Sequence, residues 1–190
     1  FTYSPCATND KFVLLAGSAP WVKKQFRLKG IDLLLEAASK IKSLHLIFLW
    51  RGLLLDELKK GITHHGVEQK VEIINEKVDV NHILSKVHAT IVLAENSKLV
   101  KAYPHSLIES LAAGKPVLIS RTIPMSDYIQ EKGFGSIIHE INFSNVLYAI
   151  QDMEKNYDSH INRVQQFDRS EFSIEKMVSS HKELYASIVK

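Results

Sequence analysis

The chain has 190 residues, of which 45% are hydrophobic and 24% charged, and its formal net charge is +3. This composition is typical of one globular domain with a substantial core, and the small charge argues against a surface for nucleic acid or anionic membranes. No apolar run approaches the roughly 18 residues of a membrane-spanning helix, and the N-terminus has no signal-peptide pattern. The single cysteine, Cys6, leaves no internal disulfide and favours a reducing compartment, which predicts a cytoplasmic protein.

Short apolar runs alternate with helical patterns along the chain. Their hydrophobicity is continuous rather than alternating, which predicts strands buried on both faces. Six strands are expected over residues 12–16, 44–50, 71–74, 89–94, 117–120 and 136–139. Helices are expected over residues 29–38, 53–62, 81–87, 104–113, 125–131, 143–156, 159–167 and 175–189. The alternation predicts an α/β fold: a Rossmann-like doubly wound parallel sheet of about six strands, helices on both faces, and further C-terminal helices.

The most informative stretch runs from Tyr103 to Val117 and reads YPHSLIESLAAGKPV. Pro104 suits the start of a helix, and Gly114 suits its end. The N-terminus of such a helix has unpaired amides and a partial positive charge, which favour binding of a phosphate. Glu109 is the one acidic residue on this helix. Helical side chains lean toward the N-terminus, so Glu109 can reach a ligand bound there.

This stretch resembles the donor-binding signature of the group 1 (family 4) retaining glycosyltransferases, which have the two-domain GT-B fold. The resemblance implies that Glu109 binds the ribose hydroxyls of a nucleotide-diphospho-sugar. It also implies that the backbone amides of Ser106 and Leu107 bind the diphosphate. His105 lies just before the helix, where its imidazole either contacts a phosphate or the sugar or has no role in the site. The alternative interpretation is an ordinary capped helix on which Glu109 is merely solvated.

A basic segment follows the first strand. Lys29 and Gly30 resemble a family segment whose lysine contacts the phosphates, so Lys29 is expected on the diphosphate. Many members also have an arginine directly after the glycine of that strand, where this chain has Ser18. Arg27 is a weaker candidate to replace it. Fixed cations neutralise a departing diphosphate without a metal.

A larger departure lies eight residues before Glu109, where the family commonly has a glutamate near the sugar and this chain has Lys101. A lysine accepts no hydrogen bond from a sugar hydroxyl. Glu95 is close in sequence and is an alternative source of a carboxylate. Catalytic residues are therefore left unassigned.

Other cofactor and metal signatures are missing. There is no Asp-x-Asp pair, no Gly-x-Gly-x-x-Gly after the first strand and no Walker-type loop, and the pair His64-His65 lacks a third metal ligand at suitable spacing. The sequence thus predicts neither a metal nor a bound cofactor, the nucleotide-diphospho-sugar being a substrate. Trp21 and Trp50 are either stacking platforms or core residues.

The resulting prediction is a C-terminal, nucleotide-sugar-binding half of a glycosyltransferase. Residues 1–11 are expected to be a linker, 12–170 the nucleotide-sugar-binding domain and 171–190 a C-terminal helix capped by Ser173. The chain lacks an initiator methionine, so we expect a fragment of a longer protein whose N-terminal domain binds the acceptor.

By resemblance, the full-length enzyme transfers a sugar with retention of configuration, and its membrane association is left open. The isolated fragment is expected to bind donor without turnover and to self-associate through its exposed face. Two alternatives remain: a non-catalytic nucleotide-sugar-binding or scaffolding domain on the same frame, and an unrelated flavodoxin-like domain.

Overall fold

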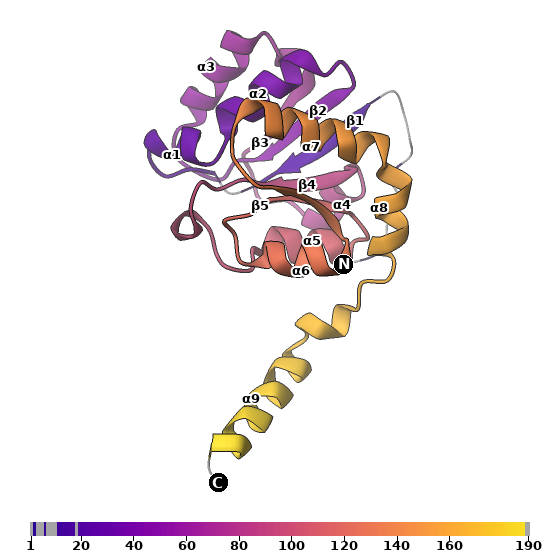
Figure 1. Ribbon diagram of the computed structural model, residues 1–190. Coiled ribbons are helices and arrows are strands. Elements are labelled where there is room, and N and C mark those ends of the chain that lie inside the picture. The colour runs from indigo at the N-terminus through magenta and orange to yellow at the C-terminus, as the bar shows by residue number, and fades with distance from the viewer. Residues whose placement is uncertain (1, 3–5, 7–10, 18, 189–190) are drawn as a thin grey trace.

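The computed structural model describes residues 2, 6, 11–17 and 19–188 (Figure 1). Its centre is a six-stranded sheet in the order β3-β2-β1-β4-β5-β6, and every neighbouring pair of strands is parallel. The strands are β1 (Phe12–Ala16), β2 (Leu44–Leu49), β3 (Val71–Ile74), β4 (Ala89–Val92), β5 (Val117–Ser120) and β6 (Gly135–Ile138). The predicted doubly wound parallel sheet is confirmed.

Helices cover both faces of the sheet, which explains the continuous hydrophobicity of the strands. Consecutive residues of β1 belong to different cores: Leu14 lies in the cluster with α2, α3 and α7, whereas Leu15 lies in the cluster with α4. A third cluster joins β4 and β5 to α5 and α6. The helices are α1 (Lys24–Leu28), α2 (Ile31–Lys40), α3 (Leu55–His65), α4 (Val80–Leu84), α5 (His105–Ala112), α6 (Met125–Lys132), α7 (Phe143–Lys155), α8 (Tyr157–Val164) and α9 (Ile174–Ile188).

The segment between β1 and β2 differs from the expectation. The helix predicted over residues 29–38 is present as α2, which begins two residues later, and the short helix α1 before it was not predicted, with Lys29 and Gly30 between the two. Gly30 has φ of 62°, a left-handed conformation that ends one helical segment and begins the next. β4 is also shorter than predicted, because Leu93 and Ala94 stay buried but leave the strand.

The C-terminal helix α9 extends away from the sheet and its covering helices, and none of its residues is buried (Figure 1). Ser173 caps it as predicted, since its hydroxyl accepts a hydrogen bond from the Lys176 amide at 3.1 Å. Most of the predicted linker over residues 1–11, and Ser18, lie outside the described residues. The domain boundaries and self-association stay predictions. Across the described part of the chain, no helix has the length and apolar character to cross a membrane.

Candidate donor-binding site

A cavity of about 540 Å³ opens at the carboxyl ends of β1 and β4. The strand order reverses direction between these two strands, because the chain proceeds from β1 to β2 and β3 on one side and then to β4, β5 and β6 on the other. Ligands of open α/β sheets bind at this kind of switch point. The lining residues are Ala19, Trp21, Lys29, Val92, Lys98, Leu99, Val100, Lys101, Pro104, His105 and Ser106.

The helix α5 begins at this cavity, as the motif predicts. Pro104 has an extended ψ of 126° directly before the first helical residue, His105. At the other end Gly114 has φ of 76°, its amide donates to the Leu111 carbonyl at 2.9 Å, and the Lys115 amide donates to the Ser110 carbonyl at 2.9 Å. This pair of bonds is a Schellman end, so the glycine terminates α5 and lets the chain enter β5.

The first turn of α5 presents a different pair of amides from the pair expected. The Leu107 amide donates to the Pro104 carbonyl at 3.0 Å, so it is engaged within the turn. The amides of His105 and Ser106 donate to no carbonyl within the described ranges. His105 and Ser106 line the cavity, whereas the Leu107 side chain is fully buried in the core. Among the described residues, the first-turn amides without a carbonyl partner are therefore those of His105 and Ser106, one residue before the pair named from the motif, and which of them binds a phosphate stays a prediction.

Lys29 reaches the same cavity from the opposite side of the switch point. Its side chain is only 6% exposed, and burial lowers the pKa of its ammonium. The backbone next to Lys29 packs closely against Leu93, and only glycine fits there: a Cβ on Gly30 would lie 2.6 Å from Leu93 Cδ1. The Glu95 amide also donates to the Leu28 carbonyl at 2.8 Å, which ties the end of α1 to the chain that leaves β4.

The loop between β4 and α5 is held at its two ends by α6 and the end of β5. The Ala94 amide donates to Ser120 Oγ at 3.0 Å, and the Ala94 carbonyl accepts from Thr122 Oγ1. Near the other end of the loop, the Met125 amide donates to the Ala102 carbonyl at 3.1 Å. These bonds fix the segment that carries Lys98 and Lys101 into the cavity.

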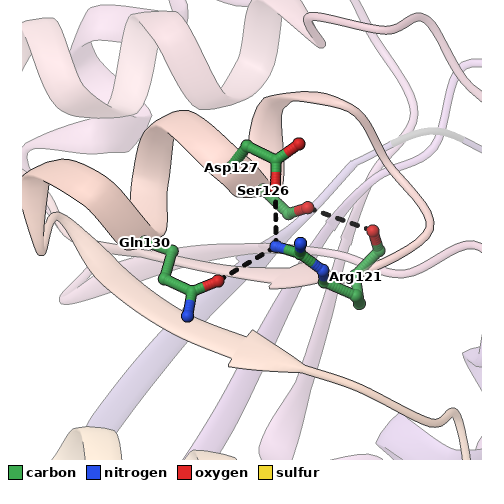
Figure 2. A network of polar contacts seen from close by, with 4 residues as sticks. All are labelled: Arg121, Ser126, Asp127 and Gln130. Atoms are coloured by element: carbon green, nitrogen blue, oxygen red, sulfur yellow. Dashed lines mark hydrogen bonds and ion pairs between the residues drawn. The ribbon is translucent and has the colours of Figure 1, made fainter.

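The turn from β5 into α6 is itself braced by Arg121 (Figure 2). Its guanidinium Nη1 lies 2.7 Å from Asp127 Oδ1 and donates to Gln130 Oε1 at 3.0 Å. Ser126 Oγ donates to the Arg121 carbonyl at 3.0 Å. Because Asp127 and Gln130 are one turn apart on α6, the arginine fixes that helix relative to the end of β5 and so supports the Met125–Ala102 contact.

Glu109 lies on α5 one turn beyond His105 and is half-buried. Burial raises the pKa of its carboxyl, and the neighbouring His105 opposes that shift. Glu109 does not line the cavity itself, so it stands beside the first turn of α5. There it can meet a ligand that extends from the helix N-terminus along α5.

The remaining basic and aromatic side chains differ in whether they line the cavity. Arg27 is exposed on α1 and is not among the lining residues, and Lys23 Nζ lies 2.8 Å from Glu57 Oε1. Trp50 is a core residue whose Nε1 donates to the Leu53 carbonyl at 3.1 Å. Trp21 is 69% exposed and lines the cavity. The cavity role of Lys98 was missed, because nothing in its sequence context distinguishes it from a solvated lysine.

A second hollow and the arrangement of possible metal ligands give no alternative functional site in the described part of the chain. A hollow of about 830 Å³ is lined by Tyr103, η3 (Arg169–Phe172) and α9, and it shares no lining residue with the switch-point cavity. Among the described residues, no group of three or more His, Cys, Asp or Glu side chains is arranged to hold a metal ion.

The fold and the cavity define a Rossmann-like domain with a lysine-lined cavity at its switch point. A family model described as "Glycosyl transferases group 1" matches residues 13–169. The chain belongs to this family, as its motif indicated. A search of curated protein sequences found no match.

Solved structures of GT-B glycosyltransferases have the same fold. HepE from Anabaena, solved with UDP and glucose, has a TM-score of 0.76 at 15% identity over 94% of this chain and 49% of its own. A glycosyltransferase from Rickettsia africae has a TM-score of 0.73 at 18% identity over 96% and 49%. Sucrose-phosphate synthase from Thermosynechococcus elongatus has a TM-score of 0.70 at 17% identity over 94% of this chain and 46% of its own. The chain thus spans less than half the length of these neighbours.

Proposed function

We propose that this chain binds the nucleotide-diphospho-sugar donor of a glycosyltransferase. The observation that carries the proposal is the meeting of the buried Lys29 and the open first turn of α5 in one cavity at the switch point. Backbone donors at a helix N-terminus and a fixed cation together suit a diphosphate. HepE, which shares the fold, was solved with UDP, so UDP is the first nucleotide to test.

In this proposal the amides of His105 and Ser106 bind the phosphate oxygens, and Lys29 neutralises their charge. Glu109 accepts hydrogen bonds from the two ribose hydroxyls, a task for which a carboxylate has enough lone pairs. The developing charge on a departing diphosphate is met by fixed donors, so no metal or other cofactor is assigned to the step. Arg27 is exposed on α1 and does not line the cavity, and its contact with the donor stays a prediction.

The full-length protein is proposed to transfer the sugar to an acceptor with retention of configuration. The other half of a GT-B enzyme would supply the acceptor site and complete the cleft, so the present chain is expected to bind donor without turnover. A cytoplasmic location remains part of the proposal.

One observation favours a second candidate function, a non-catalytic nucleotide-sugar-binding domain. Lys101 lines the cavity at the position where the family commonly has a glutamate near the sugar. A lysine does not stabilise a developing positive charge on the sugar ring. Donor binding by a full-length parent that transfers no sugar would favour this candidate over the enzyme.

The ribose contact gives the sharpest test of donor binding. Calorimetric titration of the wild-type chain is expected to show UDP binding about tenfold more tightly than 2′,3′-dideoxy-UDP, because hydrogen bonds to a carboxylate are lost. In Glu109→Ala the two ligands should bind equally, with an affinity near that of wild type for the dideoxy compound. Glu154→Ala removes a half-buried glutamate on α7 and serves as the matched control.

The control should retain the full preference for UDP. If UDP and its dideoxy analogue bind the wild type equally, the role of Glu109 is wrong. If UDP, GDP and ADP all fail to bind, the proposal of a donor site in this chain is wrong.

A further inference from the structure

The lining of the switch-point cavity is electrostatically one-sided. It contains the three lysines Lys29, Lys98 and Lys101 together with His105, and no described aspartate or glutamate lines it. Lys98 and Lys101 are exposed, and neither forms an ion pair with a described residue. The nearest acidic group that the electrostatics connect to the lining is Glu109, which interacts with His105 and not with these two lysines.

A nucleotide-diphospho-sugar balances only part of this charge. Its diphosphate is a double ester with two negative charges, whereas the three ammonium groups and the N-terminus of α5 supply more positive charge than that. Lys29 and the first turn of α5 are sufficient for the diphosphate. Lys98 and Lys101 then remain for a further anionic group.

The position of the two lysines relative to Glu109 indicates which end of the donor they meet. Glu109 lies beyond the first turn of α5 in the direction of the helix C-terminus, and Lys98 and Lys101 lie before that turn, in the loop from β4. If the ribose is held by Glu109 and the diphosphate by the first turn, the donor's other end, its sugar, extends toward this loop.

We propose that the donor's sugar carries a carboxylate, as in a hexuronic acid, and that Lys101, assisted by Lys98, binds it. This inference rests on the proposed function and names the substrate class of the same site. An ammonium group donates hydrogen bonds and matches the charge of a carboxylate, but it cannot accept from the hydroxyls of a neutral sugar. Without an acidic side chain in its lining, the cavity is poorly suited to recognise a neutral hexose.

The test compares two donors that differ only at the sixth carbon of the sugar, UDP-glucose and UDP-glucuronate. GDP-mannose and GDP-mannuronate form the same pair for a guanosine-specific site. Calorimetric titration of the chain is expected to show the uronate binding about five- to tenfold more tightly, the range of one or two exposed ion pairs. In Lys101→Met the preference, taken as the ratio of the two affinities, should fall to less than twofold.

Lys42→Met is the matched control, because it removes an exposed lysine that lies before β2, at the opposite end of the parallel strands. It changes the net charge equally and should leave the uronate preference intact. Raising the salt concentration should reduce the preference in wild type and in this control alike.

The possible outcomes distinguish failure of the uronate proposal from failure of the proposed donor site. If a nucleoside diphosphate binds but the neutral and acidic sugars bind equally, the inference is overturned and the donor site stands. The same holds if the preference survives in Lys101→Met. If no nucleoside diphosphate binds, both the donor site and the uronate are excluded.

Discussion

Gly17 and Ser106 meet across the topological switch point of the sheet. A Cβ built on Gly17 would lie 3.9 Å from both the Cβ and the Oγ of Ser106. Gly17 follows β1 and Ser106 belongs to the first turn of α5, so residues almost ninety positions apart lie side by side next to the cavity, which Ser106 lines. The absent side chain leaves room for a ligand to approach the Ser106 amide.

The substitution Gly17→Ala tests whether a ligand occupies the space between Gly17 and the Ser106 amide. The new methyl group would make only an ordinary contact with Ser106, and Gly17 does not have a left-handed φ, so the melting temperature should change by less than about 2 °C. Nucleoside diphosphate affinity should fall about tenfold, since the methyl occupies space next to the phosphate-binding amide. Gly66→Ala is the control: with φ of 63° and no heavy atom within 4 Å of its Cβ, it should cost about 1 kcal/mol of stability and leave binding unchanged. Unaltered binding in Gly17→Ala would place the phosphates elsewhere.

Lys29→Met should weaken nucleoside diphosphate binding by at least about tenfold, because a charge-assisted contact is lost. The protonated ammonium is the form that binds the anion, and burial sets its pKa below the usual range of lysine. Wild-type affinity should therefore decrease as the pH rises through that lowered pKa. The affinity of Lys29→Met should lack this decrease, and Lys24→Met on the exposed face of α1 should behave as wild type. Calorimetry between neutral and alkaline pH checks both trends; a parallel decrease in all three proteins would contradict the assignment.

Lys115 carries an ammonium that is fully buried and has no hydrogen-bond partner among the described residues. Burial lowers its pKa, and the nearby Cys6 partly opposes this. Lys115→Met should thus raise the free energy of unfolding by about 1–3 kcal/mol, since an apolar side chain of similar length needs no solvation.

The pH dependence of the same variant gives an independent readout. Between the lowered folded pKa of Lys115 and the ordinary lysine pKa, the unfolded chain binds the additional proton, so wild-type stability rises with pH in that window. The stabilisation by Lys115→Met should therefore shrink as the pH rises. Urea denaturation at several pH values measures it, with the exposed Lys42→Met as control. A destabilised Lys115→Met would show that the ammonium is solvated or paired in solution.

Helix α9 should be dispensable for folding, because none of its residues is buried. A chain that ends at Ser173 is expected to keep its melting temperature within about 2 °C. It should also lose any self-association, since the exposed apolar residues removed include Ile174, Met177 and Tyr185. Sedimentation velocity of both chains at several concentrations measures this. Equal association of the two would mean that another surface is responsible.

Much of the fold follows from local signals in the sequence. The boundaries of β1, β3 and β5 agree with the prediction; β1 and β5 are apolar runs that end at glycine or serine, and β3 is apolar except for its exposed Glu72. The Schellman end at Gly114 follows from the preference of glycine for positive φ. Local pattern did not indicate α1 or the start of α2 after Gly30, because the packing of Gly30 against Leu93 is a contact between distant segments.

The parts of the candidate site that a sequence motif encodes could be predicted. The parts that form only when distant segments come together in the fold could not. The motif identified α5 and Lys29, but the engagement of the Leu107 amide with Pro104 is a property of the folded turn. Lys98 and Trp21 enter the cavity only because the loops after β1 and β4 converge there. Arg27 was considered as a replacement for the family arginine that is absent at Ser18, and its side chain is exposed on α1 outside the cavity lining.

The central claim is that a nucleoside diphosphate binds between β1 and the first turn of α5. A two-dimensional amide NMR titration of the chain with UDP, GDP and ADP tests it most directly. The account predicts that one nucleotide shifts the amides of Gly17, Gly30, His105 and Ser106, and that Glu109→Ala weakens this response. Shifts confined to the α9 hollow, or no response to any of the three nucleotides, would contradict it.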